Sequence, residues 1–347
     1  MKNMEKVFVS SLDLKEFRGI KEIQEPLELT KFNVLLGRNN SGKSAILHAL
    51  SLLPHPRLEL PMCLKINYLP PMASPKATDI LKWEKRKGIF DYLLGGSDSA
   101  IYRYAGTAVL DFLVKGKSCQ VKISRREPEI LVEGKRIDIA DWLKQLGIEG
   151  ERGKDAVAFV PNDSTFFQSL KVNSKQNWSI VEKSGAHYWI VRDIINKSVN
   201  ETFTEVNPRE DGLYVRKEVN GGVPFYVKVR DLGDGVKKIL SVLLWLETSS
   251  PELVLWDDFE ASVHPTLIKL VLEWLMKKDW QVVLTTHSID TLLKLLELDT
   301  GSKDSSIILL QKTPEDILLH KRHSLEELEN FVIANQDPRL LSDLLKL

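Results

Sequence analysis

The segment of this sequence best suited to chemistry is residues 37–44, which read GRNNSGKS. The spacing fits a P-loop, in which backbone N–H groups wrap phosphates, Lys43 reaches the β- and γ-phosphates, and the Ser44 hydroxyl holds Mg²⁺. An apolar run at residues 32–36 precedes it and a helical pattern at residues 45–53 follows, which is the order of strand, loop and helix that this site needs. The residues expected to contact a nucleotide here are Gly37, Arg38, Asn39, Asn40, Ser41, Gly42, Lys43, Ser44 and Ala45.

A pair of aspartates, Asp257 and Asp258, ends the buried-strand pattern ELVLW at residues 252–256. A carboxylate at the carboxyl end of a sheet strand is where a Walker B element holds Mg²⁺, so we assign Asp257 to the metal. Asp258 then stands where a base can orient and activate the attacking water. Taken alone, the pair could equally be a strand that stops at a polar turn.

A histidine, His287, follows the next apolar strand pattern, residues 281–285. The carboxyl ends of neighbouring parallel strands share one edge of a sheet, so this histidine should lie near the P-loop and the aspartates. A lone histidine is more often structural. One in this position can donate an N–H to the γ-phosphate and sense the charge lost on hydrolysis.

Two glycines, Gly233 and Gly235, lie within the segment RDLGDGVKK at residues 230–238. An apolar helical pattern at residues 239–246 follows this segment. Glycines at the start of a helix expose backbone N–H groups that can bind an anion. Without the other elements, the segment is equally typical of a tight turn and a helix cap.

The composition sets the context for these elements. The 347 residues exceed the usual size of a single core, so we expect one elaborated domain or two lobes. Lys and Arg number 48, as do Asp and Glu, so any contact with DNA must come from a local patch. The two cysteines fit no metal or redox spacing, and neither a signal peptide nor a membrane-spanning run is evident. We therefore expect a cytoplasmic protein with no membrane contact.

Strand and helix patterns alternate along the chain, which predicts an α/β fold: a P-loop sheet with flanking helices, a small antiparallel β lobe and an inserted helical lid. Residues 1–53 and 206–347 should form the core, residues 54–160 a β-rich lobe or flap, and residues 161–205 the lid. The strands expected in the lobe are residues 106–114, 118–125 and 129–132. A hairpin is expected at residues 213–229, and two strands (307–310, 317–320) and two helices (325–334, 338–345) in the tail.

Five motifs in this order resemble the ATP-binding cassette (ABC) ATPases of the SMC, RecF and OLD group. They are LKEFRGI at residues 14–20, GRNNSGKS, the signature-like LGDGVKK at 232–238, LVLWDDFEASVHP at 253–265 and VVLTTHSID at 282–290. The LGxGV and EASVHP elements look closest to OLD-like ATPases. AFVPNDSTFFQSL, residues 158–170, is similar to the FxPxD segment that enters the lid of RecF-like proteins.

The resemblance implies a head-to-tail homodimer that encloses two ATP molecules with Mg²⁺. Gly233, Asp234 and Gly235 would then contact ATP bound to the other subunit, and residues 260–264 would form the D-loop at the interface. It also places Gln168 or Asn162 as the lid residue near Mg²⁺ and water, and Arg18 beside the adenine or phosphates.

Three positions depart from the pattern of the group. Gly233 replaces the usual signature serine, Phe259 replaces a common proline, and Asp258 replaces the catalytic glutamate. An aspartate is one methylene shorter, and a misplacement of about 1 Å can cost roughly 10²-fold in rate. We therefore expect slow turnover, not far above about 1 s⁻¹.

Three functions remain open at this point. The first is an ATPase that clamps DNA in repair, chromosome maintenance or defence, with basic clusters at residues 82–87, 125–126 and 321–322 as contacts, although short clusters of this kind are usually just solvated. The second is an ATP-switched module that gates a separate effector such as a nuclease. The third, a transporter ATPase, is disfavoured by the long interval between Ser44 and Leu232. No DxD pair is present, so we expect no Toprim nuclease in these residues.

Overall fold

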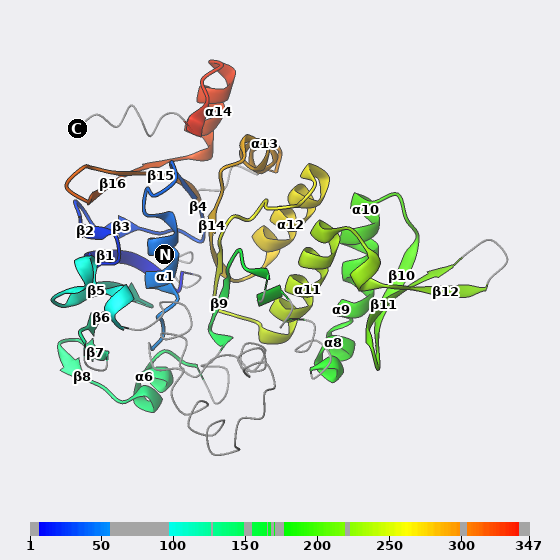
Figure 1. The fold of residues 1–347 in the computed structure, drawn as a ribbon, viewed down its shortest axis with the longest axis horizontal. Helices are drawn as coiled ribbons and strands as arrows, with labels where there is room; N and C mark the ends of the chain where they lie inside the picture. The colour runs from blue at the N-terminus through cyan, green and yellow to red at the C-terminus, as the bar shows by residue number, and fades with distance from the viewer. Residues whose placement is uncertain are drawn as a thin grey trace.

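The computed structural model describes residues 7–55, 97–125, 128–148, 155–164, 166–167, 170, 177–218, 223–298 and 304–339. Within these residues, thirteen strands form one large mixed sheet and three strands form a small second sheet (Figure 1). Helices lie on both faces of the large sheet, which confirms the predicted α/β class.

The parallel part of the large sheet runs in the order β15-β4-β14-β13-β9. Its strands are β4 (Phe32–Leu36), β9 (Val157–Val160), β13 (Leu253–Trp256), β14 (Gln281–Thr285) and β15 (Ser305–Lys312). They are apolar over most of their length because a parallel sheet between two layers is buried on both faces. Alternate residues enter two different cores: Val34 and Leu36 face one, and Leu35 faces the other.

An antiparallel part continues the same sheet. Its strands are β1 (Val9–Phe17), β2 (Ile20–Ile23), β3 (Leu27–Glu28), β5 (Ala108–Val114), β6 (Lys117–Ile123), β7 (Glu129–Val132) and β8 (Lys135–Arg136). The three strands predicted for a flap are present as β5, β6 and β7, but β5 pairs with β1 along almost its whole length. The β lobe is therefore an extension of the main sheet and not a separate flap.

The boundary expected at residue 160 does not coincide with an edge of this lobe. Strand β9 lies inside the range 54–160 and yet pairs in parallel with β13, deep in the P-loop half. The sequence pattern hid this because a four-residue apolar strand has no periodicity that assigns it to one neighbour.

The C-terminal strands join the two parts of the sheet. Strand β16 (Ile317–His323) is antiparallel to β15 and parallel to β2, while β15 lies beside β4. Helix α14 (Leu325–Ile333) follows and begins with a capping box of Ser324 and Glu327. The second helix predicted for the tail lies almost entirely outside the described residues.

The helices that hold the site have clear local causes. Helix α1 (Lys43–Leu50) packs on one face of the sheet, and α11 (Asp234–Ser249), α12 (Pro265–Lys277) and α13 (Ile289–Glu297) pack on the other. Pro265 occupies the first turn of α12, where a proline needs no N–H partner. The Ser288 side chain caps α13 by accepting from the Asp290 N–H.

The described part of residues 177–228 contains both helices and strands, and it includes much of the predicted lid (residues 161–205) together with the predicted hairpin. Its elements are α8 (Trp178–Ser184), α9 (Ala186–Trp189), the π-helical turn η5 (Ile190–Ile195), α10 (Asn196–Ser198), β10 (Phe203–Arg209), β11 (Gly212–Glu218) and β12 (Pro224–Lys228). The small sheet lies at the end of the molecule farthest from β1 to β8 (Figure 1). The predicted hairpin is present as β11 and β12, and its expected turn at residues 220–222 lies outside the described residues. Strand β10 crosses the lid boundary expected at residue 205, because Phe203 and Val206 pack on the lid helices.

Four short elements complete the described chain: α5 (Ser97–Ala100), η3 (Tyr102–Tyr104), α6 (Ile139–Gln145) and the 3₁₀ turn η6 (Val229–Asp231). None of the described helices is long and apolar enough to cross a membrane.

A buried glutamine, Gln281, joins the N-terminal strand to the parallel core. Its side-chain amide donates to the carbonyl oxygens of Val9 and Thr30 at 2.7 and 2.9 Å, and its side-chain oxygen accepts from the Val9 N–H at 2.8 Å. Both Gln281 and Val9 are fully buried. The glutamine therefore satisfies backbone groups of β1 that water cannot reach.

Replacing Gln281 by leucine should destabilise the protein by roughly 2–5 kcal/mol, because it leaves the N–H and C=O of Val9 buried without partners. The matched control is Gln145→Leu, since Gln145 is exposed and makes one surface hydrogen bond to Lys117. The control should change stability by less than about 0.5 kcal/mol. Urea unfolding of the two variants checks this, and equal midpoints would contradict it.

Candidate functional site

The P-loop follows β4 and encloses the lysine of the motif. Lys43 is 6% exposed, and its ammonium group donates to the carbonyl oxygens of Gly37 and Arg38, at 2.8 Å each. Burial lowers the pKa of Lys43, while the carboxylates of Asp258, Asp257 and Glu260 act in the opposite direction. The loop thus presents a buried cation next to an acidic cluster.

Glycine is required at two places in this loop. A Cβ at Gly37 would lie 2.4 Å from the carbonyl oxygen of Leu310 and from the Ser41 hydroxyl. Gly42 has a left-handed backbone, with φ of 99°, and stands at the N-terminus of α1. A side chain at either position would therefore clash or strain the loop.

The serine of the P-loop meets the first aspartate. The Ser44 hydroxyl lies 3.1 Å from Oδ2 of Asp257, and Thr285 donates to Oδ1 of Asp257 at 2.7 Å. One hydroxyl and one carboxylate are hard oxygen ligands of the kind that Mg²⁺ takes, with water and phosphate oxygens completing the octahedron. The donor set therefore fits Mg²⁺. No group of three or more His, Cys, Asp or Glu side chains that could hold a metal occurs in the described part of the chain.

The second aspartate, which follows β13, is oriented by groups from two neighbouring strands, β14 and β9. The Asp258 N–H donates to the Thr285 hydroxyl at 2.8 Å, and its backbone is left-handed, with φ of 45°. Asn162, just beyond β9, donates to Oδ2 of Asp258 at 3.3 Å. Nε2 of His287 lies 3.9 Å from Oδ1 of Asp258. Asn162, Asp258 and His287 therefore gather at one edge of the sheet.

The loop that carries His287 is held through its backbone. The His287 N–H donates to Oε1 of Glu260 at 2.8 Å, and its carbonyl oxygen accepts from Arg339 at 3.3 Å. Glu260 belongs to the predicted D-loop, so this loop and the histidine loop are linked directly. Phe259, where the related group has proline, is fully buried and packs edge-on against Trp256, with ring centroids 4.9 Å apart.

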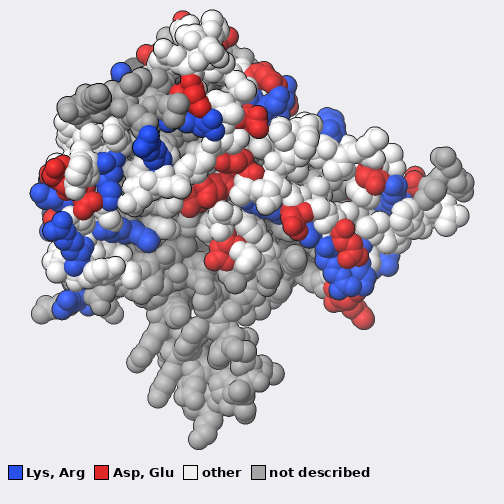
Figure 2. Space-filling model, turned by 45° about the horizontal axis from the view of Figure 1, so that its top comes forward, with Lys and Arg blue, Asp and Glu red and all other residues white. Residues whose placement is uncertain are grey.

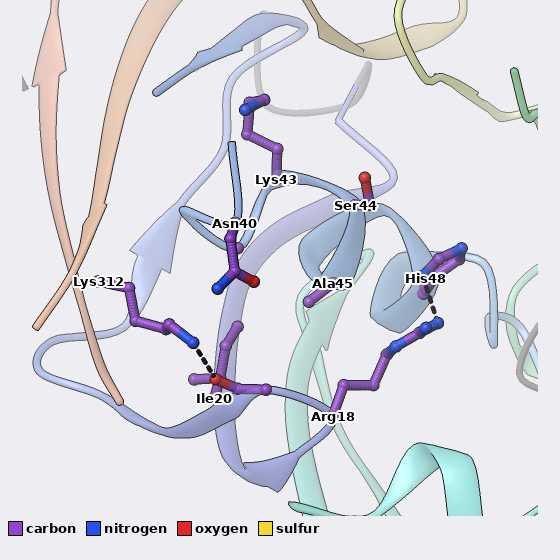
Figure 3. Close-up of a pocket in the computed structure, with 10 residues that line it drawn as sticks. Arg18, Ile20, Asn40, Lys43, Ser44, Ala45, His48 and Lys312 are labelled. Atoms are coloured by element: carbon purple, nitrogen blue, oxygen red, sulfur yellow. Dashed lines mark hydrogen bonds between the residues drawn. The ribbon is translucent and has the colours of Figure 1, made fainter. Parts of the chain in front are cut away.

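A cavity of about 400 Å³ lies beside the P-loop (Figure 3). Its lining is more polar than apolar, and it is partly open to solvent. Its lining residues are Arg18, Gly19, Ile20, Asn40, Gly42, Lys43, Ser44, Ala45, His48 and Lys312. Asn40, Lys43 and Ser44 come from the P-loop and α1, whereas Lys312 arrives from β15.

Two of these residues, Arg18 and His48, form a pair. Arg18 was predicted at this site from the sequence, and His48 was not. Nη1 of Arg18 lies 2.6 Å from Nδ1 of His48, and Arg18 itself has a left-handed backbone with φ of 53° (Figure 3). Burial, with a further contribution from Arg18, lowers the pKa of His48 to about 3. The imidazole is therefore neutral and accepts from the guanidinium, which fixes Arg18 at the cavity wall.

Lys312 is a second cation at the cavity that the sequence did not indicate. Its ammonium group donates to the carbonyl oxygen of Gly19 at 3.1 Å and pairs with Asp316 at 2.7 Å. Lys312 and His48 were not predicted from the sequence. Thr285 lies within the motif VVLTTHSID, but its contacts with Asp257 and Asp258 depend on the pairing of β13 with β14.

The signature-like segment stands apart from this cavity. Gly233 and Asp234 are exposed at the start of α11, and neither they nor Gly235 is among the residues that line the cavity. Lys237 lies 2.6 Å from the carboxylate of Asp234 and lowers its pKa. Gln168, the basic cluster at residues 82–87 and Arg126 lie outside the described residues.

Comparison with protein families gives two matches. Residues 134–294 match an AAA domain family whose description names an AbiEii toxin and a type IV TA system. Residues 7–61 match a family described only as a protein of unknown function. The search of curated proteins gave no match.

Solved structures of SMC heads resemble the whole chain. The SmcHead bound to the C-winged helix domain of ScpA matches with a TM-score of 0.56 and 16% identity, covering 93% of this chain and 100% of that one. The Smc head domain with an extended coiled coil bound to the C-terminal domain of ScpA, from Pyrococcus furiosus, matches with a TM-score of 0.53 and 12% identity, covering 94% and 99%. At these identities the likeness is one of fold.

The chain therefore shares its fold with SMC heads. The match of residues 134–294 to an AAA domain family agrees with the ATPase that the sequence motifs predict.

The depressed pKa of His48 predicts an acid-dependent loss of stability. Below pH 6.5 the unfolded chain binds a proton on this imidazole, whereas the folded protein keeps it neutral until about pH 3. Between pH 7 and pH 5 this residue should cost the folded state roughly 2 kcal/mol. His48→Gln keeps an acceptor for Arg18 but cannot be protonated, so urea unfolding should show a shallower acid slope. Equal slopes for the variant and the parent would contradict the neutral imidazole.

Proposed function

We propose that this protein binds ATP with Mg²⁺ at the cavity beside the P-loop and hydrolyses the γ-phosphate slowly. The observation that carries the proposal is the contact of 3.1 Å between Ser44 and Asp257, next to the buried Lys43. Lys43 exchanges its two carbonyl acceptors for phosphate oxygens, and Ser44 with Asp257 holds the metal. Mg²⁺, when bound, neutralises charge that develops on the phosphate oxygens.

Asp258 is the base of the proposed reaction. Asn162 fixes one of its oxygens, and the histidine loop stands on the other side, so a water bonded to Asp258 would have a defined direction. His287 supplies an N–H for the γ-phosphate. The short side chain of Asp258 is the reason that we expect slow turnover.

A second copy of the chain completes the proposed site. Gly233 and Asp234 begin a sixteen-residue helix with no side-chain cap, and they do not line the cavity of their own subunit. An exposed helix start of this kind binds anions, so we propose that it meets the ATP of a partner in a head-to-tail homodimer. The pairing of Lys237 with Asp234 offsets the carboxylate charge that would oppose a phosphate there.

DNA is the first proposed partner, in repair, chromosome maintenance or defence. On the face shown in Figure 2, basic and acidic side chains are interspersed, which favours local contacts over a broad basic field there. Lys321 and Arg322 line a groove of about 970 Å³, together with Glu25 and Glu28, and Arg322 pairs with Glu28 at 3.4 Å. Among the described residues, we propose this groove as one contact for a phosphate backbone.

An ATP-switched module that gates a separate effector is the second candidate. The description of the AAA family that matches residues 134–294 names a toxin and a type IV TA system. Both SMC heads were solved with a bound domain of a second protein, ScpA. ATP binding can drive such a switch without fast chemistry.

Steady-state ATP hydrolysis with Lys43→Ala tests the proposed function. The variant should lose at least roughly 10²-fold in turnover because it lacks the cation that binds the phosphates. Lys31→Ala, a partly exposed lysine just before β4, is the matched control and should keep parental activity. Stimulation by linear double-stranded DNA would support the DNA-clamping ATPase, and turnover indifferent to DNA would favour the effector module. Hydrolysis that survives Lys43→Ala would contradict the site.

Asp258 gives a separate prediction about rate. Asp258→Asn should retain ATP binding and lose roughly 10² to 10⁴-fold in kcat, because the amide is no base. Asp258→Glu should increase kcat, since the longer side chain restores the reach of a glutamate. Asp141→Asn, exposed on α6, serves as the control. A glutamate variant slower than the parent would show that the aspartate is not the cause of slow turnover.

A further inference from the structure

A second lysine, Lys238, is buried next to the acidic cluster and has no role in the site described above. It lies on α11, one turn after Asp234, and is 7% exposed. An ammonium group in such a position costs free energy unless it is paired, so an apolar residue would be the simpler choice for packing. The lysine therefore calls for an explanation beyond the stability of the helix.

The contacts of Lys238 connect α11 to the D-loop. Its ammonium group donates to the carbonyl oxygen of Ala261 at 3.2 Å and lies 5.1 Å from the ring centroid of Phe167, in the lid segment. Burial lowers its pKa to about 8, against the opposing effect of Glu260, Asp258 and Asp257. One side chain thus touches the signature helix, the D-loop and the lid.

A backbone contact one turn earlier strengthens the same junction. A Cβ at Gly235 would lie 2.3 Å from the carbonyl oxygen of Ser262, so only glycine permits this approach. Ser262 itself has a left-handed backbone, with φ of 64°. The first turn of α11 and the D-loop are therefore held together at two points, Gly235 with Ser262 and Lys238 with Ala261.

The other side of the D-loop holds the histidine. Oε1 of Glu260 accepts from the His287 N–H at 2.8 Å, while Oε2 of Glu260 is buried without a hydrogen-bond partner. His287 lies 3.9 Å from Asp258. A continuous chain of contacts therefore runs from α11 through Lys238, Ala261 and Glu260 to the histidine loop.

We propose that Lys238 is a positioning residue that fixes the D-loop, so that Glu260 holds His287 and Asp258 in the geometry needed for hydrolysis. The inference rests on the proposed ATPase function. Helix α11 begins with the signature-like glycines. If a second subunit contacts that end of the helix, a shift of the helix would reach Asp258 and His287 of the same chain through Lys238 and the D-loop. Lys238 acts on the rate of hydrolysis and not on the binding of ATP.

Lys238→Met tests this role because methionine fills the volume without the donor or the charge. We expect kcat to fall about tenfold or more, while the Kd for ATP and the urea midpoint stay close to the parental values. Lys238→Gln, whose amide can still donate to Ala261, should retain more activity and serves as the second variant if the methionine variant does not fold. Lys277→Met, on the surface of α12, is the matched control.

A double-mutant cycle with Glu260→Leu tests the chain of contacts. If Lys238 acts through Glu260, the double variant should be no slower than the slower single variant, since the same link is broken. Multiplying losses would overturn the link, and so would a Lys238→Met enzyme with parental kcat. If the parent shows no hydrolysis that depends on Lys43, the proposed ATPase function is wrong. That result differs from an active parent whose rate does not depend on Lys238, which would contradict only the role of Lys238.

Discussion

The site depends on one constraint, the shared edge at which parallel strands end. Strands β4, β14, β13 and β9 run in the same direction with both faces buried, so their carboxyl ends lie together. Each strand delivers a different group: the P-loop after β4, the aspartates after β13, the histidine loop after β14 and Asn162 after β9. Burial on two faces fixes the register of every strand, because a slip of one residue would exchange the two cores.

This edge of the sheet carries a cluster of acidic side chains. Asp257, Asp258 and Glu260 stand within a short stretch of chain, and like charges this close oppose one another. The buried cations Lys43 and Lys238 face this cluster from opposite elements, α1 and α11. Each lysine gains carboxylate neighbours that partly compensate for its burial, and the cluster gains positive charge that does not depend on a metal.

The antiparallel strands matter to the same site through the cavity wall. Arg18 and Gly19 form the turn between β1 and β2, and Lys312 arrives at the end of β15 beside them. Because β16 pairs with both β15 and β2, Lys312 of β15 and the turn at Arg18 and Gly19 lie at one wall of the cavity. The N-terminal extension of the sheet is therefore part of the candidate site and not an accessory lobe.

The fold class and the candidate chemical groups could be predicted from the sequence, because glycine spacing, buried apolar runs and carboxylates at strand ends are local signals. Lys43, Ser44, Asp257, Asp258 and His287 were all marked in this way. The placement of β5 beside β1, of β9 beside β13, and of His48 and Lys312 at the cavity wall could not be predicted, because it rests on pairing and packing between distant segments. Thr285 and Lys238 lie within quoted motifs, but their contacts with Asp257 and Ala261 likewise depend on how distant segments pack.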